Sequence, residues 1–135
     1  MLRKIAIAGG MVGVLVVSLA LALPQPEPSP AIMIPVETPV DVIMPTKSSR
    51  PGCEEEDRCY IPPVITIAPG QSVSWENQDA AFHSVTSGAY GETDGLFDSG
   101  YMDPGQQFQM TFHETGTFRY HCTLHPWMLG VVEVR

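Results

Sequence analysis

Positive charge is scarce in this sequence. Seven Lys and Arg residues stand against fifteen Asp and Glu residues, and the formal net charge is −8. Arg3 and Lys4 lie in residues 1–22, which contain no acidic residue, so the remainder of the chain carries −10 (−8 minus 2). Nucleic-acid phosphates are bound by Lys and Arg, so we expect no nucleic-acid partner. The acidity suits a neutral or basic protein partner, and it equally serves the solubility of an exported protein.

Cysteine is also scarce, and no internal repeat is present, so one domain is expected from 135 residues. Cys53 and Cys59 stand close together, whereas Cys122 stands alone near the C-terminus. This arrangement does not resemble a zinc set and predicts a disulfide and one functional thiol in an oxidising compartment. Closing so short a loop contributes about 2–2.5 kcal/mol in the chain-entropy model. We interpret the acidic residues 54–57 as a solvated loop tip, because the cysteine pair offers too few fixed ligands for a metal.

Charged residues are absent from the 19-residue run 5–23. The run is just long enough to span a bilayer, and Ala20-Leu21-Ala22 is also an acceptable signal-peptide cleavage site. Residues 1–23 are therefore either a signal peptide or a membrane anchor. Basic residues before the run and acidic ones after it predict that the rest lies outside the cytoplasm, in the periplasm or at the outer face of the membrane.

Proline is concentrated in residues 24–50, which contain seven prolines. Proline disfavours helices and sheet ladders and favours extended chain, so we interpret 24–50 as a linker that could reach about 80 Å. Apolar residues such as Ile32, Ile34 and Val36 are scattered through it, which leaves open that part of it packs on the domain. We assign the domain itself to residues 51–135.

Helical periodicity is missing from 51–135, where short apolar stretches alternate with turn signals. Strict alternation occurs at Phe108, Met110 and Phe112. The expected strands are 64–68, 73–75, 82–86, 97–102, 108–112, 118–122 and 129–134, with 87–95 as a loop. Seven or eight strands in so short a domain predict an all-β sandwich.

The chemistry is concentrated in one C-terminal segment. Cys122, His125 and Met128 offer a thiolate, an imidazole and a thioether within seven residues, and His83 lies upstream in a different strand-like segment. Two His, one Cys and a weak axial Met are the ligands of type 1 copper. The soft sulfur ligands suit Cu(I), and the imidazoles also accept Cu(II). The set therefore predicts one copper ion whose coordination geometry changes little on electron transfer.

The copper-loop pattern resembles that of the amicyanins and related plastocyanin-like cupredoxins. It reads Tyr120-His121-Cys122-Thr123-x-His125-Pro126-x-Met128-x-Gly130. The likeness covers roughly residues 62–135. It implies a Greek-key cupredoxin sandwich that forms a monomeric domain, with a blue copper site held by His83, Cys122, His125 and Met128.

What the resemblance implies for function is electron transfer. Such a protein shuttles single electrons between extracytoplasmic redox partners by transient docking and is not an enzyme. His125 is expected to be the electron port, and Pro126 and Trp127 to form an apolar docking patch around it, unless Trp127 instead packs against the end of the sandwich. The alternative is a copper chaperone or storage protein. Sites of that kind tend to be open and rich in Met or His, and apart from Met128 the domain has only Met102 and Met110.

One position departs from the family pattern. Many members have an Asn after the first His ligand, which ties the two ligand-bearing loops together, and a Ser or Thr after the Cys. Here Thr123 is present, but Ser84 stands in place of the Asn. Residues around the ligands tune the reduction potential, so the family does not supply a potential for this chain.

Two further histidines stand near the copper loop in sequence. His121 directly precedes Cys122, and strand alternation turns it away from that ligand. In copper nitrite reductases a His-Cys pair of this kind links two copper centres. A second centre needs more histidines, and only His113 is left over. We therefore expect structural or surface roles for His113 and His121.

Overall fold

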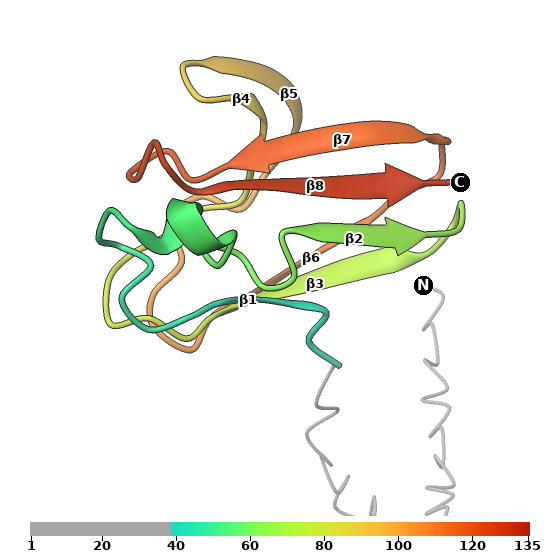
Figure 1. Ribbon diagram of the computed structural model, residues 1–135. Helices are drawn as coiled ribbons and strands as arrows, with labels where there is room; N and C mark the ends of the chain where they lie inside the picture. The colour runs from blue at the N-terminus through green and yellow to red at the C-terminus, as the bar shows by residue number, and fades with distance from the viewer. Residues whose placement is uncertain (1–38) are drawn as a thin grey trace, which may run out of the picture. The chain divides into compact units, whose positions relative to one another are not determined.

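The computed structural model describes residues 39–135 (Figure 1). The predicted signal peptide or anchor and the linker up to residue 38 lie outside the described residues. Within 39–135, no helix has the length and apolar character needed to cross a membrane.

Within the described residues, eight strands form two sheets, which confirms the all-β prediction (Figure 1). The three-stranded sheet has the order β1 (Val42–Met44), β3 (Ser72–Asn77), β6 (Gln107–Thr111). The five-stranded sheet has the order β2 (Val64–Ile67), β8 (Leu129–Val134), β7 (Gly116–His121), β4 (Thr86–Ala89), β5 (Glu92–Asp98). The one helical element among the described residues is a 3-10 turn, η1 (Cys53–Glu56).

Trp75 lies at the centre of the core. Its ring makes an edge-on contact with Tyr120 of β7 at a centroid distance of 5.4 Å, which joins the inner faces of the two sheets. Phe108 of β6 and Phe97 of β5 pack on the same indole at 5.7 and 6.2 Å. Burial of these aromatic surfaces is the main force that holds the sheets together.

Residues 97–102 were expected as one strand, but β5 ends at Asp98 and Met102 makes only an isolated bridge. Two further expected elements differ from the observed ones. Residues 82–85 were expected in a strand but form a loop, held by an isolated bridge between His83 and Met102. Residues 87–95, expected as a loop, contribute to the hairpin of β4 and β5. Gly88 explains the last difference: its φ is +97°, and a side chain there would meet the backbone of Glu92. Only glycine lets the two strands approach so closely at this bulge.

Residues 39–50, which the sequence analysis placed in the linker, are part of the fold. β1 pairs in parallel with β3, with Val42 opposite Trp75, and both Val42 and Met44 are fully buried. Pro39 and Pro45 stand outside the three-residue strand, so neither interrupts its ladder. We call residues 39–50 the N-terminal strap. The described end of the predicted linker therefore packs on the domain, a possibility that the sequence analysis left open.

Candidate metal centre

Three donor groups converge at one end of the sandwich. Cys122 follows the end of β7, His125 lies in the loop between β7 and β8, and His83 comes from the loop before β4. The Cys122 Sγ lies 3.8 Å from Nδ1 of His83 and 3.5 Å from Nδ1 of His125. All three donor atoms lie within 4.8 Å of one another. The fold thus brings together residues that are about forty positions apart in the sequence.

The fourth predicted ligand, Met128, is fully buried where the loop enters β8. Two backbone hydrogen bonds fold the loop into a tight turn: the Cys122 N–H donates to the Met128 carbonyl, and the Met128 N–H donates to the His125 carbonyl. The short spacing of the three loop residues therefore leaves little freedom in how they face the site.

Ser84 ties the two ligand-bearing loops together, in the place where the sequence lacked the family Asn. Its backbone N–H donates to the Cys122 sulfur at 3.3 Å, and its hydroxyl oxygen accepts the Thr123 N–H at 2.9 Å. Its carbonyl accepts the hydroxyl of buried Tyr60 at 2.6 Å. A serine thus joins the two ligand-bearing loops at the position where the sequence departs from the family pattern.

The environment of Cys122 favours its thiolate. Burial raises the pKa of the thiol, but the hydrogen bond from His83 and the N–H groups of Leu124 and Ser84 outweigh burial and lower it below its ordinary value. Soft metal ions bind the thiolate form, so the site is prepared for one. The pKa of His125 is lowered by burial and by the nearby His83, which favours the neutral, ligating imidazole.

His83 is fully buried and touches a carboxylate on its far side. Its Nε2 lies 3.0 Å from Oδ2 of Asp79, whereas its Nδ1 faces the Cys122 sulfur. Burial lowers the pKa of His83, but its hydrogen bonds to Cys122 and Asp79 outweigh burial and raise it. Burial alone would raise the pKa of Asp79, but hydrogen bonds from Lys47, His83, Ser49 and Ala80 hold it well below its ordinary value.

Comparison with known proteins decides the family. Residues 50–135 match the family described as copper binding proteins, plastocyanin/azurin family. The chain belongs to this family. It is 38% identical to amicyanin of Paracoccus denitrificans over 77 residues, which cover 56% of this chain and 57% of that protein. The chain thus spans less than two thirds of the length of the amicyanins that it matches.

Solved structures agree on the fold of this plastocyanin/azurin family member. A novel purple cupredoxin from Nitrosopumilus maritimus is 30% identical, with a TM-score of 0.65 over 72% of this chain and 100% of that one. The copper-containing nitrite reductase of Thermus scotoductus is 22% identical, with a TM-score of 0.55 over 73% of this chain and 22% of that one. At that identity, the second likeness concerns the fold alone.

The residues present fit the metal that this family binds. Thiolate and thioether sulfurs suit Cu(I), and imidazole nitrogens suit both oxidation states. The predicted Cys53–Cys59 disulfide is confirmed, with the two Cα atoms 4.9 Å apart, so these sulfurs are not free to compete for copper. Cys122 is the free cysteine of the chain and is buried.

The other two histidines lie apart from the donor cluster. His121 is buried and its Nδ1–H donates to the Gly88 carbonyl at 3.1 Å, so it joins β7 to the β4–β5 hairpin. The ring of Tyr90 makes an edge contact with it. His113 is exposed on the surface. Within residues 39–135, neither histidine belongs to a group of donors that could hold a second metal ion.

The expected electron port is only partly open. His125 and Trp127 are each half-buried, and Pro126 between them is exposed. The Trp127 indole lies against the core and its Nε1–H donates to the carbonyl of Ser48 at 3.0 Å. Trp127 therefore packs against the end of the sandwich, which is the alternative that the sequence analysis gave for it.

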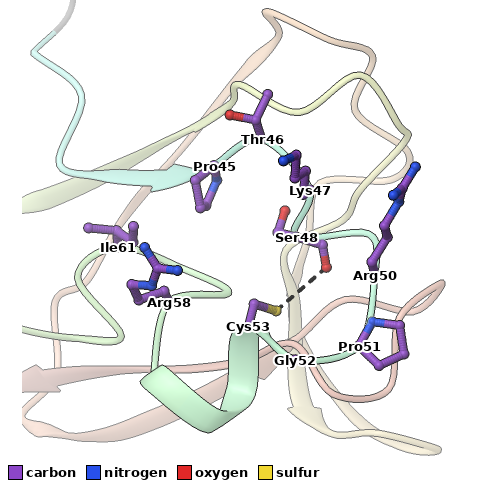
Figure 2. Close-up of a pocket in the computed structure, with 10 residues that line it drawn as sticks. All are labelled: Pro45, Thr46, Lys47, Ser48, Arg50, Pro51, Gly52, Cys53, Arg58 and Ile61. Atoms are coloured by element: carbon purple, nitrogen blue, oxygen red, sulfur yellow. Dashed lines mark hydrogen bonds between the residues drawn. The ribbon is translucent and has the colours of Figure 1, made fainter.

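Sequence reasoning missed three residues that support the centre: Ser48, Tyr60 and Asp79. Each contacts the site from a segment without metal-ligand character, and Asp79 stands in a stretch that reads as a turn. A pocket of about 310 Å³ lies beside this support, between the strap and η1 (Figure 2). Lys47, Arg50 and Arg58 line it, and none of the donor residues does.

Proposed function

We propose that this protein carries single electrons on one type 1 copper ion held by His83, Cys122, His125 and Met128. The observation that carries the proposal is the convergence of one sulfur and two imidazole nitrogens within 4.8 Å. Met128 is fully buried, and its carbonyl accepts the N–H of Cys122. Membership of the plastocyanin/azurin copper family supports it, as does the similarity to amicyanins. Copper would supply the one-electron Cu(I)/Cu(II) couple.

The chain's own residues would hold the donors in place and keep water out. Ser84 and Thr123 join the loops that carry His83 and Cys122, and the burial of His83 and Cys122 excludes solvent on that side. Donors fixed by such hydrogen bonds move little when the charge of the bound ion changes. A low reorganisation barrier follows, which favours an electron carrier over a protein that must release its metal.

We propose His125 as the port, because it is half-buried whereas His83 is fully buried. Each histidine ligand has an exposed apolar neighbour in the sequence. Phe82 precedes His83 and is 54% exposed, and Leu124 precedes His125 and is 41% exposed. A small apolar surface on an acidic domain, which we take to be a monomer, suits transient docking of a redox protein, with charge steering the approach. Leu124→Glu should slow electron exchange with such a partner while the copper spectrum is retained.

We also propose that the domain works outside the cytoplasm, in the periplasm or at the outer membrane face. The disulfide supports this location, because such bonds persist in oxidising compartments. Residues 5–23 would either direct export and be removed or stay as an anchor. Fractionation of the native protein with a mass measurement separates these cases, because a soluble form beginning near Leu23 is expected only after cleavage.

The test of the copper proposal is spectroscopic. The full chain loaded with Cu(II) should show the intense visible charge-transfer band of a copper–thiolate bond, and Cys122→Ser should abolish it. His113→Ala is the matched control and should keep the band, because His113 is exposed and outside the cluster. A colourless Cu(II) protein would contradict the proposal. If the coloured protein exchanges no electrons but yields copper readily to apo-acceptors, the chaperone or storage alternative takes its place.

A further inference from the structure

The strap ends in a turn that is fastened to a single carboxylate. The backbone N–H of Lys47 donates to Oδ1 of Asp79 at 2.8 Å, and that of Ser49 donates to Oδ2 at 3.0 Å. Lys47 has a φ of +74°, a left-handed conformation that is uncommon for a residue with a side chain. The two hydrogen bonds to a charged acceptor account for its persistence, because charge-assisted bonds are the stronger kind.

Ser48, at the centre of this turn, contacts both ligand-bearing segments. It is 1% exposed, and its hydroxyl oxygen lies 3.3 Å from Nε2 of His83. Its carbonyl accepts the Nε1–H of Trp127, which stands between the two C-terminal ligands His125 and Met128. The strap thus reaches the site from outside the strands that carry the donors, and Ser48 itself lies before the family match at residue 50.

Asp79 completes the arrangement around the first histidine. The Nε2–H of a neutral His83 has two acceptors, Oδ2 of Asp79 at 3.0 Å and the Ser48 hydroxyl at 3.3 Å. A protonated ring donates Nδ1–H to the Cys122 sulfur, whereas a neutral ring with its proton on Nε2 presents an unprotonated Nδ1 to that sulfur and to a metal. A carboxylate behind a ligating histidine fixes the tautomer and raises the basicity of the ligand.

We propose that the Ser48 turn and Asp79 are a positioning unit for the copper site: they hold His83 with Nδ1 toward the metal and favour Cu(II) over Cu(I). This inference rests on the copper site proposed above. The direction of this preference between the two oxidation states follows from charge. A more basic imidazole and a nearby carboxylate stabilise the more highly charged ion more, so their removal shifts the Cu(II)/Cu(I) equilibrium toward Cu(I).

The first test needs no metal. In alkaline buffer, where the imidazole is neutral, the Cys122 sulfur at 3.8 Å from Nδ1 competes for the ring proton with Asp79 and Ser48 at 3.0 and 3.3 Å from Nε2. ¹⁵N chemical shifts of His83 in the copper-free full chain should show the proton on Nε2, because the two acceptors there are closer. Asp79→Asn should give a mixture of tautomers, and Ser48→Ala a smaller change. Thr46→Ala is the matched control: Thr46 lies in the same turn, is exposed and should leave the shifts unchanged. A wild type with the proton on Nδ1 overturns the inference.

The second test measures Cu(II) and Cu(I) affinities separately. Asp79→Asn should weaken Cu(II) binding roughly 10–100-fold, as loss of such a supporting carboxylate does elsewhere, and Cu(I) binding by less. Ser48→Ala, which retains the carboxylate, should shift the ratio in the same direction by a smaller factor. A purely structural role would weaken both affinities equally and lower the melting temperature, and that result overturns the inference.

The two tests separate this inference from the proposed function. If wild type forms no type 1 site, the proposed function fails, while the metal-free tautomer measurement still decides whether the unit orients His83. If wild type forms the site and Ser48→Ala and Asp79→Asn leave both the tautomer and the affinity ratio unchanged, the inference fails and the proposed function stands. Should Asp79→Asn fail to fold, Ser48→Ala decides alone, because it removes only a hydroxyl.

Discussion

The loop between β7 and β8 and the N-terminal strap support the same site in different ways. The loop brings its donors as side chains within seven residues of sequence, from Cys122 to Met128. The strap acts mainly through backbone groups, and its contacts with Asp79 and Trp127 join residues 30 to 79 positions apart. Side-chain chemistry at short spacing is visible in a sequence, whereas support through backbone N–H and C=O groups is not.

The largest expected loss of stability comes from a substitution just after the loop between β7 and β8. Gly130 begins the inner face of β8, and a Cβ there would overlap the ring of Tyr120. That ring cannot move aside, because Tyr60 and Trp75 pack against it. Gly130→Ala should therefore cost about 3 kcal/mol, the upper end for overpacking a core, in the urea-induced unfolding of the copper-free protein.

A second substitution checks the cause of that loss. Gly130→Ala combined with Tyr120→Phe should recover part of the stability, because the Tyr120 hydroxyl is one of the atoms that a Cβ would meet. A Gly130→Ala variant as stable as wild type would show that the loop has more freedom than its packing indicates.

The second largest loss of stability is expected from removal of the disulfide, which joins Cys53 to Cys59 just after the strap. Replacing both Cys53 and Cys59 with Ser should cost about 2–2.5 kcal/mol by releasing the loop-closure constraint on the unfolded chain. The copper spectrum should persist, because Cys122 is untouched. Thiol counting in the denatured, unreduced, metal-free chain should find one thiol in wild type and one in the variant. Three thiols in wild type would contradict the bond.

The same contrast separates the elements of the fold that the sequence predicts from those that it does not. Alternation at Phe108, Met110 and Phe112 predicted β6 because one face of that strand meets the core. β1 was missed because three residues between prolines are too short to show a period. The ligand positions were readable from residue type alone, but nothing local marks Asp79, whose four acceptor contacts arise only when the chain folds.

The next prediction concerns Tyr60, which follows the disulfide and reaches the ligand loops. Burial, and then the nearby Cys122 and Tyr120, raise the pKa of Tyr60 well above its ordinary value. The folded state therefore favours the neutral phenol, so this contribution to stability is present below about pH 10 and is lost as the pH rises further.

Tyr60→Phe measures that contribution directly. At neutral pH it should cost about 1–2 kcal/mol, because the Ser84 carbonyl loses its hydrogen bond. Above about pH 10 the gap to wild type should shrink, by up to about 1.4 kcal/mol per pH unit. Unfolding curves at neutral pH and at two alkaline pH values test this. A gap that stays constant would show that the phenol ionises equally well in the folded state.

The smallest expected effect is at Trp127, the residue that joins the two regions. Trp127→Phe keeps an aromatic ring in the half-buried position but removes the Nε1–H that donates to Ser48. Loss of one hydrogen bond to a buried carbonyl should cost about 1 kcal/mol. Trp127 is not a proposed ligand, so the copper band should remain.

Whether the two regions act as one unit is decided by a double-mutant cycle between Trp127→Phe and Asp79→Ala. Asp79→Ala releases the turn that carries the Ser48 carbonyl, so in that background the indole has no fixed acceptor and Trp127→Phe should cost less. Residues of one hydrogen-bonded network show coupling of at least about 0.5 kcal/mol, whereas independent sites add. Additive costs in copper-free unfolding would mean that the loop and the strap support the site separately. Coupling would mean that the fold holds the two halves of the ligand set through a segment that carries no ligand.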